Sequence, residues 1–438
     1  KLSREKVDVV LVDVAADRLA EISDTLDVQT IEGPICRPAV LEEAGLKDAE
    51  LLVAVTSSDE SNILACRLSQ ILAPSVRRVA RVRDPRLLAT LSEADLRSGL
   101  GLDFIIDPTS LTVDTIMDFI DLPGAVDVID VASGRLKLIG LRLPQNHKAI
   151  GSPLSVVLPR GEGANLLAVA VYRHQQVLIP TGATVLRARD LVYMAATGEH
   201  LAEVGLFFGL EWRTVKRIFI LGGGDVGLAL ARRLEARRLE ARKDLVVKLI
   251  EQNQERCEFL SRELAKTIVL RGDATDEALL SNEGIDECDA FIAVGTDDEK
   301  NMVSCLLAKR MGAASTITRV NRYSYAPLVS AIGLESLVSA RVAAVSAILK
   351  YIRKGLVVTV ATLRNEDSEI AEMTVTEDSK MAGKPLMAVK FPSGAIIAGI
   401  LRESAAIIPK GDTVIEPGDT LVVVARSETV PLLEKALV

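Results

Sequence analysis

The chain has 438 residues, 49% of them hydrophobic, and a formal net charge of −8. This length predicts about three domains, and no apolar stretch approaches the roughly 18 uninterrupted residues of a membrane-spanning helix. An acidic chain without a Lys/Arg-rich stripe argues against a nucleic-acid partner, because such binding depends on neutralising phosphates. No basic leader with an apolar core opens the chain, and the five cysteines form no C-x-x-C pair. We therefore expect a cytosolic protein with free thiols.

The sequence is an internal duplication. The string 54–62 recurs at 293–301, shifted by 239 positions, and the pattern of 179–190 recurs at 408–419, shifted by 229. A tandem copy of a two-part unit raises the predicted number of domains to four. Their expected bounds are 1–123, 124–207, 208–354 and 355–438.

Apolar runs alternate with amphipathic stretches in the first part of each unit. In the first unit, strands are predicted at 7–13, 28–31, 50–55 and 79–82, and helices around 19–22, 40–44, 58–71 and 108–120. In the second, strands are predicted at 215–221, 245–251, 267–270, 289–294 and 315–320, and helices at 228–234 and 340–352. Continuous apolar strands separated by helices indicate a parallel sheet covered on both faces. We predict an α/β protein with two Rossmann-like, doubly wound sheet domains, each followed by a small strand-rich α+β domain.

The first unit begins one element later than the second. It opens directly on the strand that corresponds to 245–251, and its first residue is Lys1 rather than Met. The missing strand is central in a doubly wound sheet. We therefore expect that about 15–20 residues, with a strand and a glycine loop, precede this sequence in the natural protein.

A glycine loop follows the apolar strand of the second unit. Gly222, Gly224 and Gly227 form G-x-G-x-x-G between a strand and a helix, the context that a dinucleotide-binding loop requires. The first glycine permits the tight turn, the second lets a pyrophosphate approach, and the third allows close packing of helix and strand. The helix N-terminus then offers N–H groups to phosphate. The complete candidate loop also includes Gly223, Asp225 and Val226. The competing interpretation is a tight turn without a ligand.

A carboxylate ends the second strand of each unit, Glu251 in one and Asp13 in the other. At this place an acid can accept hydrogen bonds from the two hydroxyls of an adenosine ribose. It also disfavours a 2′-phosphate, since two like charges about 4 Å apart cost roughly 1–4 kcal/mol. NAD or an adenine nucleotide is therefore expected rather than NADP.

Polar residues follow the remaining strands, where ligands bind in such sheets. The candidates are Thr56 and Ser57, Gly295 and Thr296, Asp273 and Thr275, and the arginines Arg81, Arg83 and Arg319. Asp273 and Thr275 could cover the adenine, and the arginines could reach a phosphate as charged forks. Helix N-capping is the alternative for the hydroxyl and carboxylate residues, and surface ion pairing is the alternative for the arginines.

No catalytic group accompanies these candidates. A dehydrogenase needs an acid or base beside the nicotinamide, and the three histidines, His147, His174 and His200, have no triad-like neighbours. The sequence therefore favours nucleotide binding without catalysis. An NAD-dependent oxidoreductase is the rival hypothesis.

Taken together, these features resemble the TrkA family of peripheral regulatory subunits of bacterial Trk potassium-uptake systems, built from RCK (also called KTN) domains. The resemblance covers essentially the whole chain and depends on the doubled domain order and on strings such as 52–60, 79–83, 221–224 and 247–251. It implies RCK N-type sheet domains and RCK C-type small domains, with NAD(H) and ATP/ADP as ligands. It implies a homo-oligomer, a tetrameric ring, on the cytoplasmic face of the plasma membrane.

The resemblance also implies a membrane-embedded potassium-translocating Trk subunit as the partner. Regulation of a potassium channel or of a potassium/proton antiporter stays open as an alternative. The implied nucleotide residues are Gly222 to Gly227, Glu251, Gly295, Thr296 and Arg319 in the second unit. In the first they are Asp13, Thr56, Ser57 and Arg81, with Arg83 near a terminal phosphate.

Overall fold

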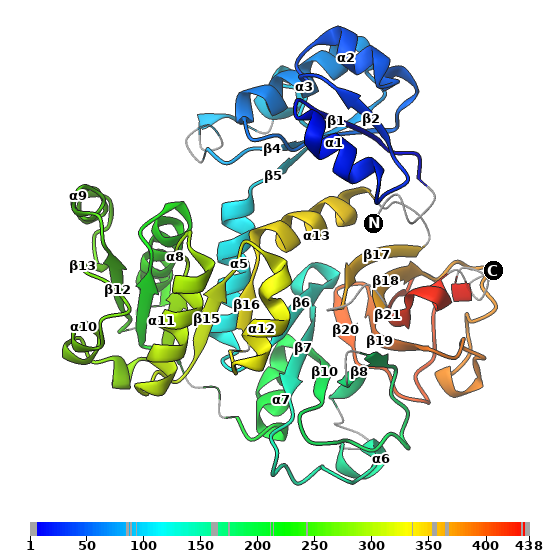
Figure 1. Ribbon diagram of the computed structural model, residues 1–438. Coiled ribbons are helices and arrows are strands. Elements are labelled where there is room, and N and C mark those ends of the chain that lie inside the picture. Colours follow the sequence, from blue (N-terminus) through cyan, green and yellow to red (C-terminus); the bar gives the residue numbers. More distant parts are fainter. Residues whose placement is uncertain are drawn as a thin grey trace. The chain divides into compact units, whose positions relative to one another are not determined.

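The computed structural model separates into two compact units, Lys1–Thr109 and Ser110–Val438 (Figure 1). The residues described are 7–84, 87, 90–92, 94–158, 165–173, 176–210, 212, 214–241, 244–334, 336–352, 357–363, 368–430 and 432–433.

The second unit contains a six-stranded parallel sheet of order β13-β12-β11-β14-β15-β16. Its strands are β11 (Arg217–Leu221), β12 (Val246–Glu251), β13 (Ile268–Arg271), β14 (Ala290–Ala293), β15 (Thr316–Arg319) and β16 (Ser336–Val338). β11, the first strand of this domain, lies in the middle of the sheet, and the strand order reverses beside it, as in doubly wound nucleotide-binding folds. The predicted α/β, Rossmann-like class is confirmed for this domain.

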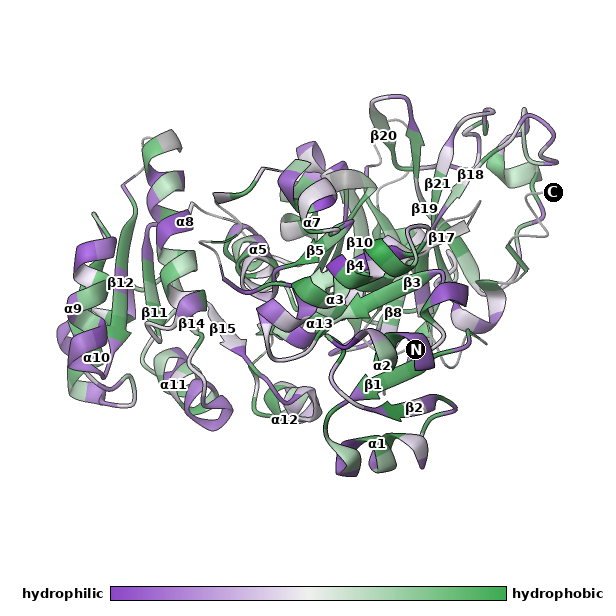
Figure 2. Ribbon diagram, turned by 90° about the horizontal axis from the view of Figure 1, so that it is seen from above, coloured by the Kyte–Doolittle hydropathy of each residue, from purple (hydrophilic) through white to green (hydrophobic). Residues whose placement is uncertain are grey.

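Helices connect these strands and cover the sheet. They are α8 (Asp225–Ala241), α9 (Gln254–Glu263), α10 (Glu277–Asn282), α11 (Asp298–Arg310) and α12 (Ala326–Ala331). The strand residues Ile220, Leu249 and Ile292 have no exposed surface. Figure 2 shows the same division, with hydrophobic strands and hydrophilic residues on the outer faces of α9, α10 and α11. Burial on both faces explains why these strands are continuous apolar runs.

The first unit repeats this plan with its sheet in two parts. β1 (Val10–Asp13) pairs with β2 (Gln29–Glu32), and β3 (Leu51–Ala54), β4 (Arg77–Arg81) and β5 (Phe104–Ile106) form the other part. The helices are α1 (Ala16–Ser23), α2 (Pro38–Glu43) and α3 (Asp59–Leu72), and a π-helical turn spans Asp95–Gly99. β11 joins the two halves of the second sheet, and within the described residues 7–109 no strand corresponds to it.

Two small antiparallel sheets follow the same order. The first runs β6-β7-β10-β8-β9 and the second β17-β18-β21-β19-β20. The first contains β6 (Asp127–Val131), β7 (Leu136–Arg142), β8 (Leu167–Arg173), β9 (Gln176–Leu178) and β10 (Leu191–Thr197), with helices α6 (Leu154–Val157) and α7 (Leu201–Phe207). The second contains β17 (Val357–Thr362), β18 (Ser368–Thr374), β19 (Ala395–Arg402), β20 (Ala405–Ile407) and β21 (Thr420–Arg426). Below, they are the first and second C domains.

Helix α5 (Pro108–Asp121) runs from the end of the first sheet domain into the second unit. Its residues Ile116, Phe119 and Ile120 are buried in the same core as Leu230 and Leu234 of α8. A predicted boundary at 123 places this helix with the first sheet domain, whereas its buried side chains belong to the core of the second unit. The division into four domains stays a prediction. The corresponding helix after the second sheet is α13 (Ala340–Ile352).

The two C domains share one hydrophobic core. Leu136 and Tyr193 of the first cluster with Ile370 and Val424 of the second. The approach is close, since a Cβ added to Gly399 would lie 2.5 Å from Leu136 Cδ2. The backbone N–H of Ala132 also donates to the Glu372 carboxylate at 3.0 Å. The C domains therefore form one packed body.

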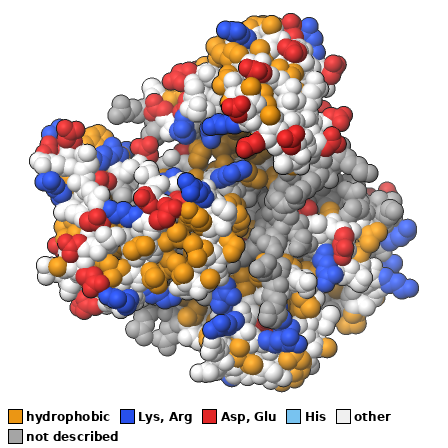
Figure 3. All heavy atoms as spheres, viewed as in Figure 1, with side chains coloured by type: hydrophobic (Ala, Val, Ile, Leu, Met, Phe, Trp, Pro, Cys, Tyr) orange, Lys and Arg blue, Asp and Glu red, His pale blue; other side chains and the backbone are white. Residues whose placement is uncertain are grey.

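The surface mixes both signs of charge. On the face drawn in Figure 3, Lys and Arg side chains are interspersed with Asp and Glu. Among the helices whose residues are described, none has both the length and the apolar character needed for a membrane crossing.

Candidate functional site

The glycine loop of the second unit begins at the end of β11 and leads into α8. Gly222 has φ of +103° and its N–H donates to the Ile250 carbonyl at 3.0 Å. A Cβ on Gly227 would lie only 1.9 Å from the Gly222 carbonyl oxygen. Glycine is thus required at both positions, as the turn and packing roles demand. A Cβ on Gly224 would meet nothing within 4 Å, so this part of the loop is open to a ligand.

Glu251 ties the loop to the end of β12. One carboxylate oxygen accepts the N–H of Gly223 at 2.8 Å, and the other accepts the N–H of Asn253 at 2.8 Å. Asp13 has the matching local contact, with the N–H of Ala15 donating to its carboxylate at 2.9 Å. A carboxylate at this place can accept hydrogen bonds from ribose hydroxyls in place of the loop N–H. That N–H is not left without a partner, because it then faces the bound ligand.

Equivalent strands of the two units each end in an arginine. Arg81 is the last residue of β4, and Arg319 is the last residue of β15. Arg81 Nη2 donates to the Thr56 carbonyl at 2.6 Å, and Arg319 Nη1 donates to the Val294 carbonyl at 3.3 Å. Both guanidiniums thus lie against the loops that contain the candidates Thr56 and Gly295.

Each of these arginines carries a buried Nε–H without an acceptor among the described residues. Burial lowers the pKa of Arg81, Arg83 lowers it further, and Asp59 opposes them. Burial also lowers the pKa of Arg319, against the opposing effect of Asp298. A buried, charged N–H without an acceptor costs folding free energy. The same unpaired N–H occurs at equivalent positions of both units, and a bound anion would supply the acceptor. The residues present therefore fit a nucleotide phosphate.

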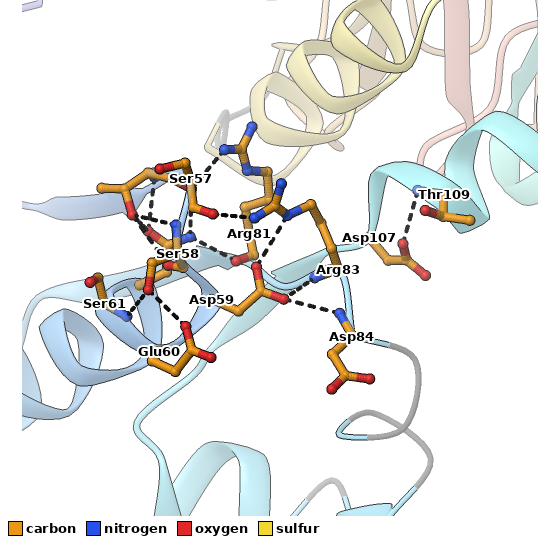
Figure 4. A network of polar contacts seen from close by, with 12 residues as sticks. Ser57, Ser58, Asp59, Glu60, Ser61, Arg81, Arg83, Asp84, Asp107 and Thr109 are labelled. Carbon is orange, nitrogen blue, oxygen red and sulfur yellow. Dashed lines mark hydrogen bonds and ion pairs between the residues drawn. The ribbon is translucent and has the colours of Figure 1, made fainter. Parts of the chain in front are cut away.

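The loop of the first unit forms a dense polar network (Figure 4). Asp59 accepts the N–H groups of Arg83 and Asp84 at 2.7 and 3.0 Å, and Arg83 Nε lies 3.3 Å from the same carboxylate. Arg83 also donates to the Ser57 carbonyl. The structure thus brings Thr56, Ser57, Arg81 and Arg83 together at one edge of the sheet.

Asp273 is held by side chains of its own unit. It accepts the N–H and hydroxyl of Thr275, both at 2.9 Å, and the Lys300 ammonium at 3.0 Å. Burial raises its pKa, but the bonds from Thr275 and Lys300 outweigh this and lower it overall. Asp273 therefore shapes the loop after β13 as an ionised group. Contact of Asp273 with an adenine stays a prediction.

Comparison with known proteins gives matches over nearly the whole chain. The TrkA-N domain model matches residues 1–108 and 218–340, and the TrkA-C domain model matches 138–209 and 370–438. A Trk system potassium uptake protein TrkA from Vibrio alginolyticus is 36% identical over 95% of this chain and 90% of its own length. One from Halomonas elongata is 34% identical over 96% and 91%.

The chain belongs to the TrkA family. A solved structure of the GsuK RCK domain has the same fold, with a TM-score of 0.56 at 20% identity over 100% of this chain and 91% of its own. The GsuK channel bound to NAD matches with a TM-score of 0.56 at 20% identity, over 100% of this chain and 75% of its own. Both shared folds agree with the predicted RCK N-type and C-type domains.

The two candidate sites of this TrkA-family chain differ in charge at one position. Arg83 follows β4 by two residues, and Asn321 follows β15 by two. Asn321 makes the corresponding contact, with its side-chain nitrogen 2.9 Å from Asp298. At this position the first unit thus has an arginine where the second has an uncharged asparagine.

The sequence interpretation missed two buried asparagines, Asn62 and Asn301. Asn62 Nδ2 donates to the carbonyls of Thr56 and Arg81, at 3.2 and 2.9 Å. Asn301 Nδ2 donates to those of Gly295 and Arg319, at 2.9 and 3.0 Å. Each therefore joins the candidate loop to the strand that bears the arginine. The available signal was their recurrence in the duplicated string.

The two described histidines, His147 and His200, contact residues other than those of these loops. His147 Nε2 is 2.6 Å from the Phe207 carbonyl, and His200 Nδ1 is 2.8 Å from the Thr197 hydroxyl. His174 lies outside the described residues. No group of three or more potential metal ligands occurs in the described part of the chain.

Proposed function

We propose that this TrkA-family chain is a nucleotide-sensing regulatory subunit. It binds NAD(H) and ATP/ADP in its two sheet clefts, assembles as a tetrameric ring, and gates a membrane-embedded potassium-translocating Trk subunit from the cytoplasmic side. The observation that carries this proposal is the pair of equivalent arginines, Arg81 and Arg319, each with an orphaned buried Nε–H beside a loop at the strand ends.

In the second cleft, the loop Gly222–Gly227 and the N-terminus of α8 provide the cradle for a pyrophosphate. Glu251 accepts hydrogen bonds from the adenosine ribose, and Arg319 donates to a phosphate oxygen. The surroundings are supplied by Asp225, Val226, Asp273, Gly295 and Thr296.

In the first cleft, Arg81 and Arg83 face the same edge from one strand end. A terminal phosphate adds charge that two guanidiniums recognise better than one. Regulation then follows from differential affinity, because a ligand shifts a conformational equilibrium only by binding its states unequally. Arg81 is the residue through which ATP and ADP act differently.

Calorimetric titration of the full chain with NADH, NAD⁺, ATP and ADP tests the binding. Loss of a charge-assisted hydrogen bond costs about 1.5–3 kcal/mol, so Arg319→Gln should raise the Kd of its ligand roughly 10- to 150-fold. Arg217→Gln is the matched control, since Arg217 begins β11 at the opposite edge of the sheet, where it pairs with Glu287. Absence of heat with all four ligands contradicts the proposal.

Potassium flux through the membrane partner, reconstituted with this chain, tests the regulation. Arg81→Ala should remove the difference between ATP and ADP. An unchanged difference in that variant contradicts the role given to Arg81.

A further inference from the structure

The two C domains contain one equivalent corner each, built on the same hydrogen-bond frame. In the first, the N–H of Leu143 donates to the Asp190 carbonyl at 2.8 Å, and that of Arg189 to the Leu143 carbonyl at 3.0 Å. In the second, the N–H of Val375 donates to the Asp419 carbonyl and the N–H of Gly418 donates to the Val375 carbonyl, both at 2.8 Å. The frame aligns the corners residue by residue.

Five aligned positions differ in charge between the two corners, and at one of them, Arg187 and Glu416, the sign is opposite. The first corner consists of Arg142, Gln145, Asn146, Arg187 and Arg189, and the second consists of Thr374, Glu377, Asp378, Glu416 and Gly418. Three arginines and no acid stand in the first, and three acids and no base stand in the second. An exposed lysine, Lys148 or Lys380, follows in both and adds the same charge to each.

The first corner keeps Arg189 against a conformational cost. Arg189 has φ of +64°, a left-handed conformation that L side chains rarely adopt, while Gly418 has that place in the second corner with φ of +88°. Arg142 Nη1 donates to the Arg189 carbonyl at 3.1 Å. With its amide oxygen toward Arg189, Gln145 accepts from Arg189 Nε at 2.9 Å. Arg187 is exposed.

The second corner has a glycine where the first has Arg189. A Cβ on Gly418 would meet nothing within 4 Å. Glu377 and Asp378 are exposed, and their carboxylates have no hydrogen-bond or ion-pair partner among the described residues. Glu416 pairs with Arg402 of its own domain.

We propose that the first corner of one copy binds the second corner of the next copy, with Arg187 reaching Glu377 over Gly418. This inference depends on the homo-oligomer of the proposed function and names the surfaces that join it. A second copy is the occupant because the chain itself carries the matching charge at the matching positions. Such a contact is head-to-tail, and repeated head-to-tail contacts close into a ring when the rotation permits.

Charge exchange in the full-length protein tests the contact, with the assembly constant measured by sedimentation equilibrium. Arg187→Glu and Glu377→Arg should each weaken assembly by about tenfold or more, because like charges then meet. The double variant exchanges the charges at every contact and should return assembly to within about threefold of the unmodified chain. Added salt should weaken the unmodified assembly, since both groups are exposed.

Lys47→Glu is the control, an equal change of charge on an exposed lysine of the first unit. Nucleotide calorimetry on the same variants separates this inference from the proposed function, because neither corner contributes to the clefts. Unchanged assembly in both single variants overturns the contact, as does failure of the double variant to recover or a monomeric unmodified chain. Loss of binding to phosphatidylglycerol vesicles in Arg187→Glu, with unchanged assembly, would assign the first corner to lipid and overturn it as well.

Discussion

Gly227→Ala tests the loop of the second cleft most directly. The added Cβ would lie 1.9 Å from the Gly222 carbonyl oxygen and 3.0 Å from its carbon. Ordinary carbon–oxygen contacts begin near 3.3 Å, so loop and helix must separate by about 1.4 Å. Overpacking of this kind costs about 1–3 kcal/mol of stability.

The loss of ligand affinity should be larger than the loss of stability. A loop displaced this far no longer presents its N–H groups to a pyrophosphate. Two charge-assisted hydrogen bonds at about 1.5 kcal/mol each amount to about 3 kcal/mol, which raises the Kd for NADH at least about 100-fold.

Calorimetric titration with NADH, together with urea unfolding followed by circular dichroism, measures both effects. Gly198→Ala is the control, because a Cβ there meets nothing within 4 Å and the backbone is not left-handed. A folded Gly227→Ala variant that binds NADH as tightly as the unmodified chain would refute the assignment of this loop to phosphate.

Three further predictions concern other parts of the chain. Burial raises the pKa of the Cys66, Cys288 and Cys305 thiols to about 12, so at pH 8 their thiolate fraction is about 10⁻⁴. A thiol reagent should modify the half-buried Cys36 rapidly in the folded protein, whereas these three buried cysteines should react only after unfolding. Asp419→Asn leaves the Arg402 guanidinium with half of a bidentate pair and should lower the free energy of unfolding by about 1.5–3 kcal/mol; Asp190→Asn should match it, and a urea midpoint equal to that of the unmodified chain in either variant would contradict this. Glu251→Ala removes the like charge facing a 2′-phosphate, which costs about 1–4 kcal/mol, so the ratio of Kd for NADPH to Kd for NADH should fall about 5- to 800-fold. An unchanged ratio in calorimetry would exclude Glu251 from the ribose site.

The alternation of apolar runs and amphipathic stretches was sufficient to predict most of the parallel sheet. Strands buried on both faces give continuous apolar strings, and these are visible in any one sequence. The last strands, β5 and β16, were missed because three residues are too short to show a period. Helix α8 begins at Asp225 rather than at Leu228, since a glycine in its first turn hides the start of the helical pattern.

The candidate site was predictable where chemistry restricts the residue type. Glycines at fixed spacing and an acid at a strand end have steric and electrostatic reasons that the sequence displays. Asn62 and Asn301 act through hydrogen bonds to main-chain carbonyls, and no local pattern distinguishes such an amide from one on a helix surface. The contrast between Arg83 and Asn321 became visible only once both were seen to contact equivalent aspartates.

The burial of α5 in the second unit has a consequence for attempts to divide this chain. Residues 208–438 expressed alone would leave Leu230 and Leu234 without the covering supplied by Ile116 and Phe119. The internal duplication suggests two separable modules, but helix α5, which follows the first sheet, is part of the hydrophobic core of the second unit. Division at the repeat boundary should therefore yield fragments with exposed apolar surface that aggregate. Division before residue 110 follows the boundary between the two compact units.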